Sequence, residues 1–303
     1  MNPPVSDDGA KPTAFVPERL VLGRAERRPA VLEVIRSART RLALSLFRCT
    51  DFKVLDALAE ACRRNVRVQV LLTRRARGWK KRLKELRAFL ESMGAEVQRY
   101  SGKQAKYHAK YIVADEGPAL IGSLNFTYKC FHRTCDFLLV THDPEVILGL
   151  QKLFEADWHP GEIGSPDGLG DRLIIAPEQA RARLADLLRQ ARRTIHIIDH
   201  RVTDPEFVAL LKSKELEGVE VTVLGRGSLG NLLAHGKMIL MDGSSAVIGS
   251  LSLSRPSLDS RREVAVLIRD PLCLQQLEEF FQRMAASRTT GTPNPPSPTD
   301  ATP

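Results

Sequence analysis

The stretch YHAKYIVAD at residues 107–115 and the stretch AHGKMILMD at residues 234–242 share one pattern, His-x-Lys-x4-Asp. Each ends in an apolar run that favours a β-strand, so we predict that the His and Lys of each copy lie on a strand. Alternate residues of a strand share a face. We therefore expect each imidazole to point the same way as its neighbouring ammonium group, an arrangement suited to a phosphate group.

The two copies belong to a longer internal repeat. From His108 onward a constant offset of 127 residues relates the two halves. It pairs the Gly-Ser dipeptide at 122–123 with that at 249–250, and Asp136 with Glu263. Chance similarity does not keep one spacing over so many polar positions, so the repeat indicates duplication.

An earlier part of the repeat has a different offset. Residues 36–51 align with residues 189–204 without gaps at an offset of 153. The difference between the two offsets predicts an insertion of 26 residues in the first half, over roughly residues 74–102. Strand and helix patterns alternate on both sides of it, which is typical of layered α/β folds.

We predict two similar α/β domains, each a mixed sheet flanked by helices, that form a pseudo-twofold bilobal monomer. The predicted boundaries are 15–158 for the first domain and 172–287 for the second, with a Gly- and Pro-rich linker over 159–171. The polar segment 1–14 and the Pro-, Thr- and Ser-rich segment 288–303 are expected to be disordered.

The repeated residues resemble the defining motif of the phospholipase D superfamily, in which Gly-Ser-x-Asn and an acid follow His-x-Lys-x4-Asp. The resemblance covers most of residues 30–286, and the layout of the first half is similar to the bacterial phospholipase D and cardiolipin synthase-like branch. The first copy comprises His108, Lys110, Asp115, Gly122, Ser123, Asn125 and Asp136, and the second His235, Lys237, Asp242, Gly249, Ser250, Ser252 and Glu263.

Two positions depart from the usual family pattern. Ser252 stands where Asn is usual, so an amide that would contact phosphate becomes a hydroxyl. Asp136 stands where Glu is common, which shortens one carboxylate by a methylene. Either change could alter activity or substrate choice.

The resemblance implies a two-step mechanism without metal or cofactor. One histidine, which we expect to be His108, attacks phosphorus and forms a phosphohistidine, while His235 acts as acid and then base. The side chains expected to hold the phosphate charge are those of Lys110, Lys237, Asn125 and Ser252. The side chains expected in supporting roles are those of Asp136 and Glu263, which would orient the imidazoles, and of Asp115, Asp242, Ser123 and Ser250.

The composition favours an anionic partner. The net charge is +9 and the isoelectric point is about 9.5. A basic cluster over 74–87 surrounds Trp79 and is read in two ways, as a solvated helix face or as a phosphate-facing surface beside the site. No apolar run approaches the length of a membrane span and the N-terminus lacks an apolar signal. We expect a cytoplasmic protein, with peripheral membrane contact through the basic cluster left open.

Several other signals receive ordinary explanations. Five cysteines are an odd number in a chain of this size, so we expect neither a disulfide framework nor a zinc site at Cys130, Cys135 and His132. The GxGxxG match at 225–230 is read as a flexible approach to the second motif. The histidines outside the motif are expected to be surface or core residues, namely His132, His142, His159, His196 and His200.

Three functions remain open from sequence. The first is a phospholipid enzyme that catalyses hydrolysis or phosphatidyl transfer, and the second is a nuclease or DNA-end-processing phosphodiesterase. The third is a binding or scaffold protein with little catalysis, which the intact His and Lys of both copies argue against. Because both copies lie on one chain, an obligate dimer is unnecessary.

Overall fold

The computed structural model describes residues 18–104, 106–160, 168–225 and 227–289. The predicted N-terminal segment 1–14 lies outside these residues, as do most of the predicted linker and most of the predicted C-terminal tail. Within the described ranges, no helix is both long enough and apolar enough to cross a membrane. The domain boundaries themselves stay predictions.

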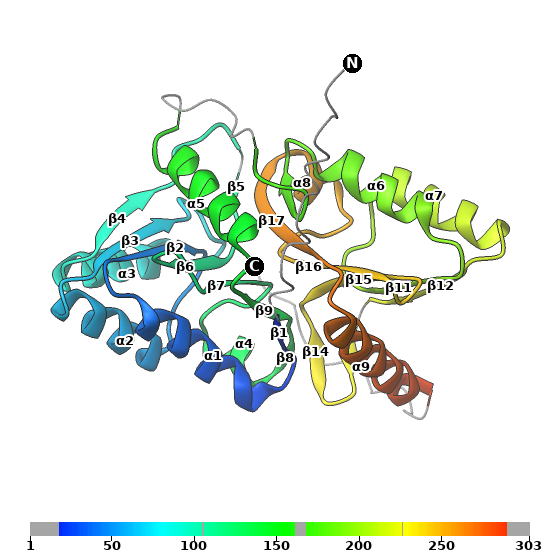
Figure 1. Ribbon diagram of the computed structural model, residues 1–303, viewed down its shortest axis with the longest axis horizontal. Helices are drawn as coiled ribbons and strands as arrows, with labels where there is room; N and C mark the ends of the chain where they lie inside the picture. Colours follow the sequence, from blue (N-terminus) through cyan, green and yellow to red (C-terminus); the bar gives the residue numbers. More distant parts are fainter. Residues whose placement is uncertain (1–17, 105, 161–167, 226, 290–303) are drawn as a thin grey trace, which may run out of the picture.

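Strands and helices alternate along the chain, as predicted (Figure 1). The first half contains β1 (Arg19–Val21), α1 (Arg24–Ser37), β2 (Arg41–Leu46), α2 (Phe52–Arg63), β3 (Arg67–Leu72), α3 (Lys80–Ser92), β4 (Glu96–Arg99), β5 (Lys106–Tyr107), β6 (Tyr111–Ala114), β7 (Ala119–Gly122), α4 (Tyr128–His132), β8 (Thr134–Cys135), β9 (Leu138–Thr141) and α5 (Pro144–Trp158). The second half contains β10 (Leu173–Ala176), α6 (Ala180–Gln190), β11 (Thr194–Ile198), α7 (Pro205–Leu216), β12 (Glu220–Leu224), β13 (Ser228–Leu229), β14 (Leu232–Ala234), β15 (Lys237–Met241), β16 (Ser245–Gly249), α8 (Arg255–Asp259), β17 (Arg261–Ile268) and α9 (Pro271–Thr289).

Each half forms a mixed sheet, and the two sheets correspond strand by strand. The first has the order β1-β9-β7-β6-β2-β3-β4 and the second the order β10-β17-β16-β15-β11-β12. The one strand without a counterpart on these two paths is β4, which follows α3. These two elements are the insertion that the change of offset predicted, and the duplicated α/β fold is confirmed.

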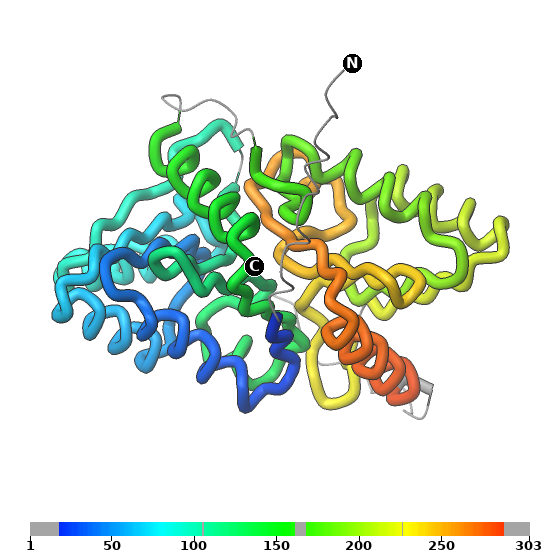
Figure 2. The backbone as a smooth tube through the Cα atoms, in the orientation of Figure 1, coloured from blue at the N-terminus to red at the C-terminus, as the bar shows by residue number. Residues whose placement is uncertain are grey.

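Helices cover both sheets and join the halves at the centre (Figures 1 and 2). In β2, Leu42 and Leu44 pack with α1, α2 and α3 on the outer face, whereas Ala43 belongs to a central core between the two sheets. The central core also includes Leu150 of α5 and Leu277 of α9. Helices α6 and α7 cover the outer face of the second sheet.

The turn after the first long strand is built in the same way in both halves. Asp51 caps the N-terminus of α2 by accepting from the N–H of Val54, and Asp204 caps that of α7 by accepting from two N–H groups of its first turn. The backbone N–H of Asp51 donates to the carbonyl of Phe126, and that of Asp204 donates to the carbonyl of Leu253. These equivalent contacts bring the turn of each half beside its Gly-Ser segment.

The motif strands begin later than predicted. Strand β6 begins at Tyr111, so His108 and Lys110 precede it, and β15 begins at Lys237, so His235 precedes it. The prediction that both motif residues of each copy lie on a strand is therefore wrong: neither His108 nor Lys110 does, and in the second copy only Lys237 does. The residues before each strand are instead paired with the opposite half of the molecule.

Candidate active site

Two short strands cross between the halves and lead directly into the motifs. Strand β5 pairs in parallel with β17 of the second half, and the backbone N–H of His108 donates to the carbonyl of Arg262 at 2.8 Å. Strand β14 pairs in parallel with β8 of the first half, and the N–H of Gly236 donates to the carbonyl of Cys135 at 2.6 Å. Each motif histidine is thus placed beside the segment of the other half that carries an acid, Glu263 on β17 or Asp136 directly after β8.

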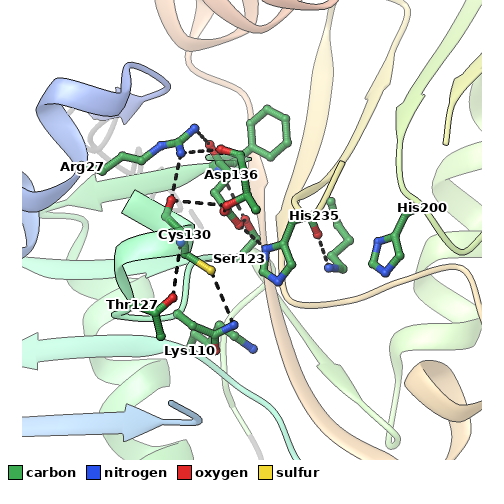
Figure 3. Close-up of polar contacts among 12 residues, drawn as sticks. Arg27, Lys110, Ser123, Thr127, Cys130, Asp136, His200 and His235 are labelled. Carbon is green, nitrogen blue, oxygen red and sulfur yellow. Dashed lines mark hydrogen bonds and ion pairs between the residues drawn. The ribbon is translucent and has the colours of Figure 1, made fainter. Parts of the chain in front are cut away.

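The crossing produces two imidazole–carboxylate pairs, each made from both halves. Nδ1 of His108 lies 2.8 Å from Oε2 of Glu263, and Nδ1 of His235 lies 2.7 Å from Oδ1 of Asp136. Figure 3 shows the second of these pairs. Both carboxylates are buried, whereas the His108 and His235 side chains are 16% and 27% exposed. The second nitrogen of each ring is therefore the one available to a ligand.

Burial and charge set the protonation of these pairs. Burial lowers the pKa of His108 to about 3; Glu263 opposes this shift, while Lys110 and Lys237 add to it. The pKa of His235 is also lowered by burial, with Asp136 opposing and the same two lysines adding. Because both lysines act on both imidazoles, the four motif side chains share one site.

The two acids are anionic. Burial alone would raise the pKa of Asp136 and of Glu263, but the neighbouring imidazole holds each at about 2. An anionic carboxylate at Nδ1 favours the tautomer that keeps its proton there and leaves a lone pair on Nε2. That nitrogen is then suited to attack an electrophile or to exchange a proton.

The motif lysines are buried and fold back onto the motif backbone. Lys110 donates from Nζ to the carbonyl of His108 at 2.7 Å, and Lys237 donates to the carbonyl of His235. Lys110 Nζ also lies 5.1 Å from the centre of the Phe47 ring. Burial lowers the pKa of Lys110 to about 7; the negative charge of Glu263 opposes this shift and the positive charge of Lys237 adds to it. Such an ammonium group would gain from a phosphate anion beside it.

The Gly-Ser pairs support the acid strands. Ser123 donates from Oγ to Asp136 at 2.7 Å, and Ser250 donates to the carbonyl of Val264 at 3.2 Å. Gly249 has a φ of 154°, and a Cβ there would lie 2.4 Å from the carbonyl oxygen of Val264. Glycine is therefore required for this close approach.

Asn125 and Ser252 are equivalent in sequence but not in their contacts. Asn125 is buried, its Nδ2 lies 3.9 Å from the Cys130 sulfur, and its Oδ1 has no hydrogen-bond partner among the described residues. Ser252 donates its single hydroxyl proton to Asp199, whose two oxygens lie 2.9 and 2.8 Å away. The prediction that Ser252 donates to phosphate is corrected, because a buried carboxylate already takes that proton.

The motif aspartates lie at turns and bind backbone. Asp115 has a φ of 46° and accepts from the N–H groups of Arg39, Thr40 and Arg41, at 2.6 to 2.8 Å. Asp242 has a φ of 55° and accepts from three equivalent N–H groups at the start of β11. Their carboxylates therefore hydrogen-bond the start of β2 and of β11 to the turn that ends each motif strand.

Two further residues near the site were missed from sequence. Arg27 of α1 is fully buried and donates to the carbonyls of Cys130, Thr134 and Asp136, which fixes the segment that carries the acid (Figure 3). His200 follows β11 and lies beside His235, with 6.5 Å between ring centroids. The signal for His200 was its alignment with Phe47 in the ungapped repeat.

One group of potential metal ligands occurs near the motif in the described part of the chain. The Cys130 sulfur, an Asp136 oxygen and a His235 nitrogen lie within 4.8 Å of one another. Asp136 and His235 are already hydrogen-bonded to each other, so an ion would have to replace that bond. The residues therefore fit a closed imidazole–carboxylate pair better than a metal site.

The predicted basic cluster has two parts. On α3, Lys81 and Arg87 form ion pairs with Glu85 and Glu91, as on an ordinary solvated helix. Arg74 and Arg75 instead line a cavity of about 240 Å³ together with Lys103 and Lys106. Lys106 Nζ lies 4.7 Å from the centre of the same Phe47 ring that Lys110 approaches. Arg74 and Arg75 of the cluster are thus linked to the site through a shared cavity with Lys106.

Solved structures share this fold at low sequence identity. A polyphosphate kinase from Porphyromonas gingivalis matches with a TM-score of 0.73 and 17% identity over 89% of this chain. The match covers 50% of the kinase, so this chain spans half of that protein's length. A phosphatidylserine synthase from Haemophilus influenzae matches with a TM-score of 0.68 and 11% identity, over 88% of this chain and 86% of that one.

A shorter match is to Nuc from Salmonella typhimurium, a phospholipase D family member, with a TM-score of 0.43 and 20% identity over 47% of this chain and 95% of that one. No curated protein matches the sequence. The family model described as "Cardiolipin synthase, PLD-like domain" matches residues 31–158 and 226–285, more than half of the chain. With the two crossed histidine sites and the duplicated fold, this match shows that the chain belongs to the phospholipase D superfamily, in the cardiolipin synthase PLD-like family.

Proposed function

We propose that the protein is a phosphodiesterase that cleaves phospholipids through a phosphohistidine intermediate, by hydrolysis or by phosphatidyl transfer to an alcohol. The observation that carries this proposal is the pair of crossed imidazole–carboxylate contacts beside two buried lysines. A neutral imidazole whose Nδ1 is held by a carboxylate is suited to nucleophilic attack, and a second one is suited to proton transfer.

In the first step, Nε2 of His108 attacks phosphorus and the bond from phosphorus to the leaving oxygen breaks. His235 gives its proton to that oxygen. Burial and the two lysines disfavour the protonated form of His235, and the substrate's own negative charge would favour it. Lys110, Lys237 and the Asn125 amide would stabilise the added charge on the phosphoryl oxygens.

In the second step, water or an alcohol attacks phosphorus and gives its proton to His235. The phosphorus–nitrogen bond breaks and His108 returns to its starting form. No metal is needed in this scheme, because two lysines supply the positive charge at the phosphoryl oxygens.

A phospholipid substrate is supported by the description of the matching family and by the cationic cavity near Phe47. Exposed Lys and Arg side chains contribute about 1 kcal/mol each near an anionic membrane surface. We propose that the basic cluster makes this peripheral contact.

A nuclease is the second candidate, and one observation favours it. Trp79, the partly exposed N-cap of α3, has Arg48 at 5.0 Å and Arg82 at 5.4 Å from its ring centre. An accessible aromatic ring among cations is typical of surfaces that hold single-stranded nucleic acid.

One assay separates the two candidates. Vesicles of phosphatidylglycerol or phosphatidylcholine and, separately, labelled single-stranded DNA are incubated with the protein in EDTA, with and without ethanol. We expect phosphatidic acid from vesicles, and phosphatidylethanol when ethanol is present. Cleavage of DNA alone would overturn the lipid proposal, loss of activity in EDTA would overturn the metal-free mechanism, and full activity in His108→Asn/His235→Asn would overturn the site.

A further inference from the structure

The two walls of the site differ at one pair of equivalent positions. In the ungapped repeat, Phe47 aligns with His200 and Leu46 aligns with Asp199. The Phe47 ring packs edge-on against His108, with centroids 4.6 Å apart. The His200 ring lies nearly parallel to His235, with an interplanar angle of 12°. An apolar wall in the first half therefore corresponds to a polar wall in the second.

The His200 ring makes no hydrogen bond through Nδ1 within the part of the chain that the structure describes, and that atom is buried. The nearest carboxylate oxygen, Oδ1 of Asp199, is 3.9 Å away, beyond hydrogen-bond distance. Both Asp199 oxygens accept from Ser252, and one also accepts from the N–H of Leu253 at 2.8 Å. Asp199 is thus hydrogen-bonded to residues of the second half and accepts no hydrogen bond from His200.

A cavity lies next to this ring. It has a volume of about 460 Å³ and is lined by His200, Arg201, Gly227, Leu233 and Ala234. His200 lines this cavity and its ring centroid lies 6.5 Å from that of His235, so the cavity lies one side chain away from the proposed acid–base imidazole. The His200 side chain is 28% exposed, and with Nδ1 buried its exposed edge is the edge away from that atom. The volume is in the range of small-ligand sites.

The surrounding charge is positive. Burial lowers the pKa of His200 to about 3, and Lys237, Arg201 and His235 add to the shift, with Asp136 opposing it. His200 is therefore neutral at pH 7 and can accept a hydrogen bond from a hydroxyl group. Two nearby cations disfavour a ligand that is itself cationic.

We propose that this cavity is the subsite for the alcohol that leaves from or is added to phosphorus, and that His200 accepts a hydrogen bond from a second hydroxyl group of that alcohol. His200 is a specificity residue, and the subsite selects a neutral polyhydric alcohol over a quaternary ammonium alcohol. The inference rests on the proposed function, which places His235 as the group that exchanges a proton with this alcohol.

The test uses competition for the phosphohistidine, which does not depend on the amount of active protein. With bis(p-nitrophenyl) phosphate as donor, water competes with 1,3-propanediol or 1-propanol, and with choline or its uncharged analogue 3,3-dimethyl-1-butanol. We expect 1,3-propanediol to be preferred over 1-propanol by about 2- to 10-fold, the range of one neutral hydrogen bond. We expect choline to be the poorer acceptor of the second pair.

His200→Phe, which copies the first half, should abolish the preference for the diol. His142→Phe is the matched control, because His142 is exposed after β9 and outside the site. An unchanged diol preference in His200→Phe would overturn the proposal, as would a wild-type preference for choline.

A binding measurement distinguishes failure of this inference from failure of the proposed function. In the inactive His108→Asn/His235→Asn variant, glycerophosphoglycerol should protect His200 from diethyl pyrocarbonate, as read by mass spectrometry, and glycerophosphocholine should not. Equal modification with both compounds would overturn the subsite whether or not the protein cleaves lipids. Protection without lipid cleavage would keep the subsite and refute the proposed function.

Discussion

Removing the charge of either crossed carboxylate, Glu263 or Asp136, should slow a different step of the proposed reaction. Glu263→Gln and Asp136→Asn each remove one negative charge from a buried contact of 2.8 or 2.7 Å with an imidazole. If His108 is the nucleophile, Glu263→Gln weakens attack on phosphorus. Asp136→Asn weakens proton transfer to and from the leaving and attacking oxygens.

The expected magnitude follows from the geometry. A hydrogen bond to a charged group contributes about 1.5–3 kcal/mol, and both carboxylates are buried enough for the contact to be fully formed. At about 1.36 kcal/mol for each factor of ten in rate, either substitution should slow its step by roughly 10- to 150-fold. Each variant also keeps the size of the side chain, so a packing loss contributes little.

The assay compares two diesters, one with a nitrophenol leaving group and one with an alkyl alcohol leaving group. Nitrophenol needs no proton in order to leave, whereas an alkoxide does. Glu263→Gln should slow both substrates equally. Asp136→Asn should slow the alkyl diester more, and should show a burst of nitrophenol because the second step still needs His235 as base. The reverse pattern would refute His108 as nucleophile, and near-normal rates in both variants would refute the role of the crossed pairs.

Three further predictions concern stability. Asp242→Asn should lower the free energy of unfolding in urea by about 1–3 kcal/mol, because its carboxylate accepts hydrogen bonds from three backbone N–H groups. The control Asp186→Asn, at an exposed position, should change that free energy by less than about 0.5 kcal/mol. Equal effects of the two substitutions would refute the structural role of Asp242. Arg27→Met should cost about 3 kcal/mol or more in thermal unfolding, because it leaves buried carbonyls unpaired, and a Tm within 2 °C of wild type would contradict this. His108 has a folded pKa of about 3 against about 6.5 when unfolded, so the unfolded chain binds the extra proton and stability should fall by about 1.4 kcal/mol per unit as pH drops from 6.5 toward 3. In urea unfolding at pH 7, 6 and 5, the free energy of unfolding should change less with pH in His108→Asn than in the wild-type protein. An equal pH dependence in the two proteins would contradict this prediction.

The repeat in the sequence was enough to predict the duplicated fold and the insertion. The constant offset from His108 to Asp136 required two equivalent strand sets, and the change of offset located α3 and β4. The short helices α4 and α8 were not predicted, because five residues are too few to show helical periodicity. The edge strands β1 and β10 were also missed, because 3 and 4 residues are too few to show an alternating pattern.

The pairing of acids with histidines could not be predicted. His108 and Glu263 are 155 residues apart, and their contact depends on the two-residue strand β5 reaching across to β17. Sequence spacing within one half gives no indication of that crossing. Likewise, Ser252 reads as a phosphate ligand until Asp199 is seen beside it, and nothing local in the sequence places those two side chains together.

The exchange of strands between the halves also bears on how activity arises during synthesis. His108 emerges from the ribosome well before Glu263, and until β17 has been made β5 has no strand to pair with and the imidazole has no carboxylate to fix its tautomer. Asp136 likewise has no imidazole partner until His235 has been made. If the first half folds early, as N-terminal domains do, His108 would therefore lack its carboxylate partner at that stage, and the proposed cleavage would begin only after β17 has been made.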